Sequence, residues 1–103
     1  MYFMTVNYPV TAGKSFNQQY YLNNHLPLVQ SLFSKHGLSA MSPKLALGYA
    51  PGKPDAFYAS VDLIFDSLES LKLALKAEGK KVNADVKNYT DVEPSYIFGE
   101  IAD

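Results

Sequence analysis

Cysteine is absent from this chain of 103 residues. Without thiols there is no disulfide, no thiolate-bound metal and no cysteine nucleophile, and the composition suits a reducing cytoplasm. Long apolar runs are missing as well, because no stretch approaches the roughly 18 residues of a membrane span. The N-terminus also lacks the basic lead and the cleavage site of a signal peptide. We therefore expect a cytoplasmic protein with no membrane segment.

An excess of one charge is missing too. Nine basic side chains stand against ten acidic ones, which gives a net charge of -1 at pH 7. A nucleic-acid partner normally requires a positive surface that neutralises phosphates. The aromatic strand signature with an adjoining basic residue, which RNA-recognition domains use, is not found either. We therefore expect no nucleic-acid partner.

What the chain does contain is enough apolar material for one core. Hydrophobic residues make up 48% of the sequence and charged residues 18%, and no linker, repeat or low-complexity run divides it. Two cores would each have to form from roughly fifty residues, where burial becomes marginal. We expect a single domain over residues 1–103.

Apolar spacing predicts four strands and two helices in the order βαββαβ. Alternation of side chains predicts the strands, at residues 2–8, 40–49, 57–65 and 95–101. Spacings of three and four residues predict one helix from Ser15 to about Gly37 and a second from the capping signature at 66–69 to Gly79. Pro27 removes an amide donor from the first helix, so we expect a kink or a restart there. Residues 80–91 are expected to form a helical turn and a loop.

This order folds most simply as an α+β sandwich, in which two helices cover one face of a four-stranded antiparallel sheet. The alternation places five large side chains on the opposite face: Phe3, Tyr58, Ile64, Tyr96 and Phe98. Together they form a larger apolar patch than a soluble monomer usually exposes. We therefore expect another surface to cover them.

His25 lies in the middle of the apolar face of the first predicted helix, one turn from Tyr21 and from Leu28. Its imidazole is thus expected to be buried. It could be a core histidine held by a carbonyl or a tyrosine hydroxyl, because buried polar groups are normally paired. It could equally be a general base or a polar anchor for a ligand. The spacing leaves both interpretations open.

The segment from Phe16 to Leu28, FNQQYYLNNHLPL, resembles the F-x-x-x-Y-Y-x-x-x-H-x-P-L helix of the EthD family, which is named for ethyl tert-butyl ether degradation. Further similarities follow the family's order along essentially all 103 residues: Tyr8-Pro9, Gly37-Leu38, Phe65-Asp66-Ser67-Leu68-Glu69, and Ala84 to Asp91. Two departures are Tyr89, where the family often has Phe, and Phe33, where Trp is frequent.

The resemblance implies a ferredoxin-like fold in which the sheets of two subunits pair into a dimeric α/β barrel. A homodimer of this kind would cover the aromatic sheet face. The family label is associated with oxidoreductases and small-molecule degradation. Membership specifies no substrate and no reaction, and kinship of fold with small monooxygenases, isomerases and cyclases is an analogy.

Other candidate site residues are a carboxylate and several tyrosines. Asp85 belongs to the family's late motif with Asn88 and Thr90, and such residues commonly cap helices and close turns. A second interpretation has Asp85 orienting His25 for proton transfer. Aromatic rings that carry a hydroxyl suit a pocket for a small apolar or aromatic ligand, although they are also common in cores and interfaces. The tyrosines selected as ligand-binding candidates are Tyr21, Tyr58 and Tyr96.

Metal and cofactor sites find little support. The only histidines, His25 and His36, are eleven residues apart, which is roughly 16 Å along a helix, so they cannot share an ion within one chain. We expect no metal and no required cofactor, although a lone helical histidine leaves a haem ligand open.

Two functions remain in competition. In the first, His25 transfers a proton on a small, mostly apolar, oxygen-bearing substrate that Tyr21 polarises. In the second, the same pocket belongs to a non-catalytic accessory protein that binds or delivers a hydrophobic compound.

Overall fold

A computed structural model describes residues 1–46 and 56–102. The predicted turn at residues 51–54 and the last residues of the predicted second strand, 47–49, lie outside the described residues. The elements follow the order β1 (Tyr2–Pro9), α1 (Gln18–Tyr20), a π-helical turn η1 (Tyr21–His25), α2 (Leu26–Phe33), a short turn η2 (Ser34–His36), β2 (Leu38–Leu45), β3 (Phe57–Phe65), α3 (Leu68–Asp85), η3 (Val86–Asn88) and β4 (Ser95–Glu100).

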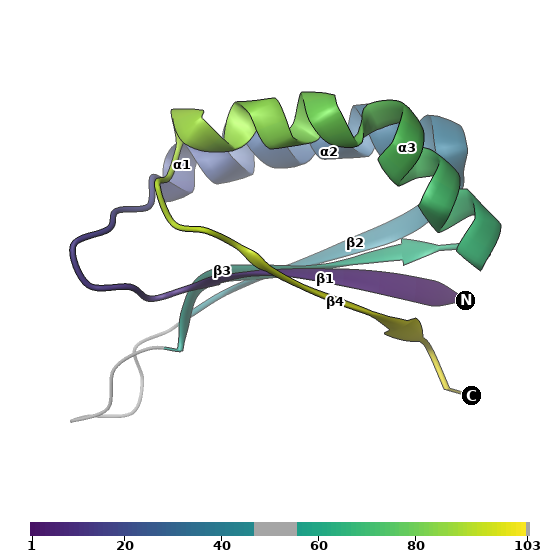
Figure 1. The fold of residues 1–103 in the computed structure, drawn as a ribbon, viewed down its shortest axis with the longest axis horizontal. Coiled ribbons are helices and arrows are strands. Elements are labelled where there is room, and N and C mark those ends of the chain that lie inside the picture. Colours follow the sequence, from purple (N-terminus) through teal and green to yellow (C-terminus); the bar gives the residue numbers. More distant parts are fainter. Residues whose placement is uncertain (47–55, 103) are drawn as a thin grey trace.

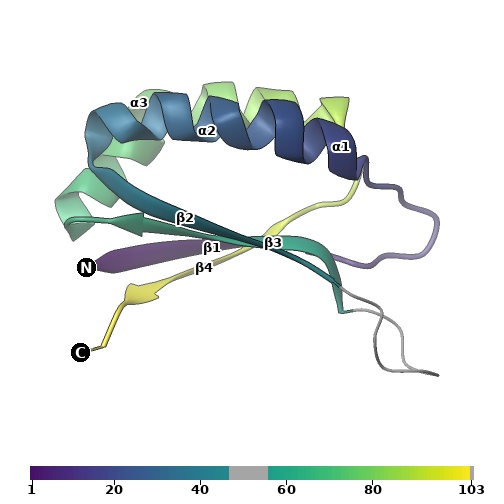
Figure 2. The same ribbon diagram turned by 180° about the vertical axis from the view of Figure 1, so that it is seen from behind.

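The four strands form one antiparallel sheet in the order β2-β3-β1-β4. Both helical segments lie on the same face of this sheet, and the opposite face carries no helix in the described part of the chain (Figures 1 and 2). The α+β, ferredoxin-like fold expected from the sequence is therefore confirmed.

The core lies between the sheet and the helices. Alternate residues of β1 and β3 are buried on the helix side, where they meet the apolar stripes of α2 and α3. The largest side chains that are fully buried are Tyr8, Tyr21, Phe33, Leu63 and Phe65. Each side chain of this size contributes about 2 kcal/mol by its removal from water.

The first helix begins later than the sequence predicts. Asn17 is its N-cap, and the Asn17 side chain accepts a hydrogen bond from the Tyr20 amide at 3.1 Å. Ser15 is not a cap, because its amide donates to Asp91 Oδ1 at 3.0 Å and its carbonyl accepts from Thr90 Oγ1 at 2.6 Å. The prediction of a start at Ser15 was wrong, since contacts with a distant segment hold this residue outside the helix.

The break expected at Pro27 is present as the π-helical turn. The amide of Leu26 donates to the carbonyl of Tyr21, five residues earlier. The α2 helix then starts with Pro27 in its first turn, where a missing amide is tolerated. Tyr21 and His25, the first and last residues of this turn, are both buried. Such π-turns occur often at functional sites.

The α3 helix starts as predicted, with the Ser67 side chain accepting from the Ser70 amide. It continues through Gly79 to Asp85, so the helix runs on without a break into the predicted helical turn and the predicted loop begins later than expected. Val82 and Val86 extend the inward stripe beyond Gly79, which the polar composition of this stretch concealed. No helix within residues 1–46 and 56–102 is long and apolar enough to cross a membrane.

The outer sheet face differs from the prediction. Tyr96 pairs with Val6 and Phe98 with Met4, so both aromatic residues of β4 share the helix side of the sheet. Tyr58 lies where the β1–β3 register shifts, and its ring stacks on Phe16 at a centroid distance of 5.6 Å. The apolar side chains that do lie on the outer face are Phe3, Ile64 and Ile97.

Candidate functional site

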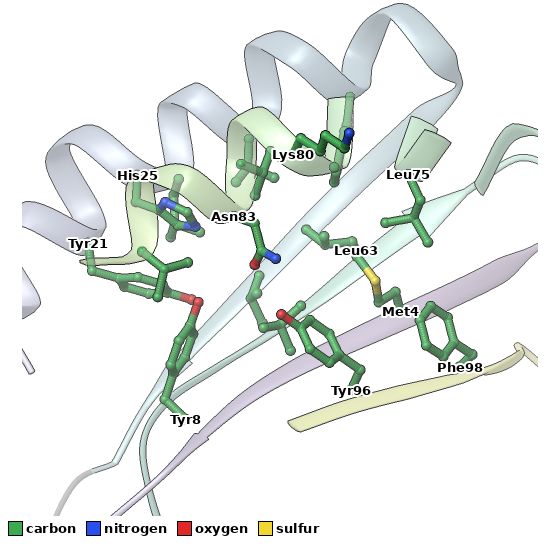
Figure 3. Close-up of a pocket in the computed structure, with 18 residues that line it drawn as sticks. Met4, Tyr8, Tyr21, His25, Leu63, Leu75, Lys80, Asn83, Tyr96 and Phe98 are labelled. Atoms are coloured by element: carbon green, nitrogen blue, oxygen red, sulfur yellow. The ribbon is translucent and has the colours of Figure 1, made fainter. Parts of the chain in front are cut away.

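A cavity of about 440 Å³ lies between the sheet and the two helical segments, η1–α2 and α3. Its inner end is buried and contains Tyr8, Tyr21 and His25, while its mouth lies between α3 and β4 (Figure 3). Most of the wall is apolar, as expected of a site for a small molecule. The apolar lining residues are Met4, Val6, Leu26, Val29, Phe33, Val61, Leu63, Leu75, Val82, Val86 and Phe98.

The imidazole of His25 is held by a carboxylate. His25 Nδ1 lies 2.9 Å from Asp85 Oδ2, and the residue is only 3% exposed. The two residues come from η1 and from the end of α3, which lie side by side in both views of the ribbon (Figures 1 and 2). Because an ionised carboxylate only accepts, the Nδ1 atom carries the proton. The Nε2 lone pair then faces the cavity, and Nε2 has no hydrogen-bond partner among residues 1–46 and 56–102.

Asp85 is itself fixed by two further donors. Its Oδ1 atom accepts from the Tyr20 hydroxyl at 2.8 Å and from Asn88 Nδ2 at 2.9 Å. Burial alone would raise the pKa of Asp85, but the hydrogen bonds from Asn88, His25 and Tyr20 together lower it below its usual range. The carboxylate therefore stays ionised and keeps the His25 ring in one orientation.

The protonation state of His25 reflects two opposing effects. Burial lowers its pKa, and the hydrogen bond and negative charge of Asp85 raise it, with burial the larger effect. The pKa of His25 is therefore below the usual value of 6.5. At neutral pH the imidazole is uncharged and can accept a proton at Nε2.

Tyr21 supplies a second polar atom at the inner end. The residue is fully buried, its ring stacks on His25 with centroids 5.9 Å apart, and its hydroxyl has no partner among the described residues. Burial raises the pKa of Tyr21, and the nearby Tyr8 raises it further, so the hydroxyl remains protonated. A buried donor without a protein partner, on a residue that lines the cavity, is a candidate to bind an oxygen of a ligand.

The hydroxyl of Tyr8, unlike that of Tyr21, is hydrogen-bonded within the protein. Tyr8 Oη lies 2.5 Å from Tyr89 Oη. Burial raises the pKa of Tyr8 to about 12, with the Tyr89 hydrogen bond opposing the shift. The ring of Tyr89 also packs on His25, with centroids 4.6 Å apart. Tyr8 and Tyr89 were not among the residues predicted to form the site, although both belong to the segments that resemble the EthD family.

The predicted ligand-binding tyrosines fall into two groups. Tyr21 and Tyr96 line the cavity, from η1 and β4 respectively. Tyr58 does not line it, because its ring stacks on Phe16 and its hydroxyl donates to the Lys14 carbonyl at 3.3 Å. Tyr58 lies where the register between β1 and β3 shifts, so its side chain points away from the site. The sequence alone does not reveal this shift.

Two polar residues of the mouth, Lys80 and Asn83, were missed by the sequence analysis. They lie beyond Gly79, in the stretch that was expected to form a helical turn and a loop. If the predicted helix had been extended past Gly79, Asn83 would have been expected one turn after Gly79, on the same face of the helix. Within residues 1–46 and 56–102, no group of three histidine, cysteine, aspartate or glutamate side chains is arranged to hold a metal ion.

The chain matches a family model and several solved structures of known proteins. A family model described as the EthD domain matches residues 13–93. A crystal structure of an EthD-like protein from Ralstonia eutropha JMP134 is 32% identical, with a TM-score of 0.86 over 96% of this chain and 89% of that chain. An EthD family protein from Bacillus halodurans C-125 is 23% identical, with a TM-score of 0.75 over 99% of each chain. The resemblance to the EthD family is thereby confirmed.

A more distant structure shares the fold alone. A dimeric protein of unknown function with a ferredoxin-like fold, from Bacteroides fragilis, is 12% identical, with a TM-score of 0.54 over 97% of this chain and 95% of that chain. No curated protein matches the chain.

Proposed function

The chain belongs to the EthD domain family, and from that premise we propose that its cavity binds a small, mostly apolar molecule from which His25 removes a proton. The observation that carries the proposal is the 2.9 Å contact between His25 Nδ1 and Asp85 Oδ2, which leaves Nε2 for the cavity. A buried, neutral imidazole backed by an ionised carboxylate is the arrangement of a general base.

The proposed step is deprotonation of a carbon next to a carbonyl group. His25 Nε2 takes the proton and the C–H bond breaks. The electron pair of that bond forms a C=C bond to the carbonyl carbon, and the π pair of the carbonyl moves onto its oxygen to give an enolate. Tyr21 Oη donates a hydrogen bond to that oxygen and stabilises its charge. Asp85 stabilises the imidazolium that forms and contacts no substrate atom. The reverse transfer returns the proton, so the step needs no cofactor.

The test is deuterium exchange into 2-tetralone, a bicyclic ketone of mostly apolar surface, followed by NMR in D₂O. We expect the protein to accelerate exchange above the buffer rate. His25→Gln should lower the protein-dependent rate about 100-fold, because the base is lost. Tyr21→Phe should lower it about tenfold or more, because the enolate loses its donor. His36→Gln is the matched control, since it removes the other histidine of the chain, and it should change nothing.

Two results would contradict the catalytic role. One is an exchange rate that His25→Gln leaves within about threefold of the wild-type rate. The other is binding of 2-tetralone, measured by calorimetry, without any acceleration of exchange. The second result would assign the cavity to a non-catalytic protein that binds or delivers its ligand.

We also propose that the protein is a homodimer that pairs through the outer sheet face. Ile97 is 57% exposed there and pairs with Thr5 of β1, while Phe3, two residues from Thr5, pairs with Ile64 of β3 on the same face. The fold-level relative from Bacteroides fragilis is dimeric. Sedimentation velocity should give a dimer for the wild-type chain and a monomer for Ile97→Asp, whereas Leu73→Asp, at an exposed position on α3, should leave the dimer intact. A wild-type monomer at micromolar concentration would refute the pairing.

A further inference from the structure

The mouth of the cavity contains polar groups of its own. Asn83 on α3 and Tyr96 on β4 both line the cavity, and their side chains point toward one another across the mouth (Figure 3). Neither side chain has a hydrogen bond to any residue in the part of the chain that the structure describes. Both side chains are exposed, so they are accessible to a ligand that enters at the mouth.

Asn83 lies at the rim of the cavity, in the last turn of α3. Asn83 lies within α3, three residues before Val86, and it caps neither end of the helix. Its neighbours on the cavity side are Lys80, Val82 and Val86, so the exposed amide lies at the rim of a mostly apolar wall. A few polar groups placed in such a wall normally fix the orientation of a ligand.

We propose that Asn83 and Tyr96 form a second polar subsite, which binds a neutral oxygen of the same ligand whose first oxygen lies between His25 and Tyr21. This inference rests on the proposed function, because it assumes that the inner end binds an oxygen. The ligand is then a mostly apolar molecule with two separated oxygen functions.

The sheet gives the spacing between the two subsites. Tyr96 pairs with Val6, and Tyr8 at the inner end is two residues further along β1. Two residues of an antiparallel strand span about 7 Å. The oxygens of the ligand must therefore be on distant atoms of its skeleton. Beyond Tyr96 the wall is formed by Met4, Leu63 and Phe98, which suits an apolar end of the ligand.

The charges around the mouth favour a neutral oxygen over a carboxylate. Glu93 is near enough to Tyr96 that its negative charge adds to the effect of burial in raising the Tyr96 pKa. The side chain of Lys80 runs along α3, away from the amide of Asn83 (Figure 3). An asparagine amide offers both a donor and an acceptor. The subsite therefore suits a hydroxyl or a carbonyl group.

The experiment compares bicyclic probes by calorimetry. The single-oxygen probe is 2-naphthol, and 2,6-dihydroxynaphthalene adds a hydroxyl at the far end. The wild-type protein should bind the 2,6-diol about fivefold tighter, which is the value of one net hydrogen bond. The 2,3-diol, with adjacent hydroxyls, and 6-hydroxy-2-naphthoate, with a carboxylate, should show no such gain.

Two variants assign the gain to the subsite. Asn83→Leu and Tyr96→Phe should each reduce the preference for the 2,6-diol to less than about twofold. Both should bind 2-naphthol like the wild type, which also shows that the cavity is intact. Lys80→Gln is the matched control at the same mouth and should keep the full preference.

The outcomes separate this inference from the proposed function. If 2-naphthol binds and His25→Gln weakens its binding, but the 2,6-diol gains nothing, the second subsite is refuted and the inner site stands. A preference that survives in both variants, or that the 2,3-diol shares, also refutes the subsite. If 2-naphthol does not bind, or binds independently of His25 and Tyr21, the proposed function fails and the subsite fails with it.

Discussion

Tyr8 and Tyr21 lie next to each other in the cavity wall, with ring centroids 5.7 Å apart, but only the hydroxyl of Tyr8 is hydrogen-bonded. The two residues thus differ in what their hydroxyls do for the folded state. Tyr8 shares a hydrogen bond with Tyr89, whereas Tyr21 Oη is buried without a protein partner in the described residues. A group that costs stability and persists at a cavity wall suggests a role in binding.

Removal of the two hydroxyls should therefore have opposite effects on stability. Tyr8→Phe leaves the Tyr89 hydroxyl buried and unpaired, so we expect a loss of about 1–2 kcal/mol in the free energy of unfolding. Tyr21→Phe removes an unpaired hydroxyl, so stability should stay the same or rise by up to about 1 kcal/mol. Urea denaturation of both variants measures the difference. A larger loss for Tyr21→Phe than for Tyr8→Phe would mean that the Tyr21 hydroxyl has a partner in the folded protein.

The titration of His25 should reveal its burial and its carboxylate. We expect an NMR titration to give a pKa below 6.5, because burial outweighs the stabilising effect of Asp85. In Asp85→Asn the pKa should fall further, because the negative charge that favours the imidazolium is gone. The chain has two histidines, and His36→Gln assigns the resonances. A His25 pKa that is the same in Asp85→Asn as in the wild type would show that the two side chains are not in contact.

The sequence predicted most of the fold because its strands differ on their two faces. The predicted β3, residues 57–65, agrees with the observed Phe57–Phe65, and its alternate apolar residues Ala59, Val61, Leu63 and Phe65 are buried on the helix side. The orientation of β4 could not be predicted in the same way. Tyr96 and Phe98 alternate with Ile97, so both faces of that strand are apolar. Only the pairing with β1 decides which face meets the cavity.

The candidate site was partly predictable for a similar reason. The position of His25 on the apolar helix face indicated a buried imidazole, and the structure buries it. Its contact with Asp85 joins residues 60 positions apart in the sequence, and no local pattern contains that information. Asn83 was missed because residues 80–85 are polar and show weak periodicity. Helical continuation there depends on packing against the sheet, which overrides local propensity.

Two glycines differ in how much space their surroundings leave for a side chain. Gly13 and Gly37 both have positive φ, of 77° and 93°. A Cβ atom at Gly13 would meet nothing within 4 Å, whereas at Gly37 it would lie 2.6 Å from Ser70 Oγ and 2.8 Å from Ser70 Cβ. Gly13→Ala should therefore cost only the conformational strain, about 1 kcal/mol. Gly37→Ala should cost clearly more, because α3 must shift as well. Equal losses of unfolding free energy would contradict this difference.

The lowered pKa of His25 also predicts how stability changes with pH. The folded state holds His25 below 6.5, and the unfolded chain restores the ordinary value of 6.5. Between these two values the unfolded state binds more protons, so the free energy of unfolding must increase as the pH rises. The slope from this one group is at most about 1.4 kcal/mol per pH unit. Above about pH 7.5 the contribution should be constant, because His25 is then neutral in both states.

Asp85 changes the free energy of unfolding in a lower pH range than His25, so the contributions of the two groups can be measured separately. Its pKa in the folded state is below the usual 3.8, and its contribution is therefore present above that value and is lost as the pH falls through the lowered one. Urea denaturation between about pH 5 and 8, at one protein concentration, isolates His25. We expect His25→Gln to flatten the rise in this range, and His36→Gln in the same series shows how much the other histidine contributes. If the wild-type free energy of unfolding fell with rising pH and His25→Gln abolished that fall, the folded protein would stabilise a charged imidazole, and the neutral base proposed for the cavity would be refuted.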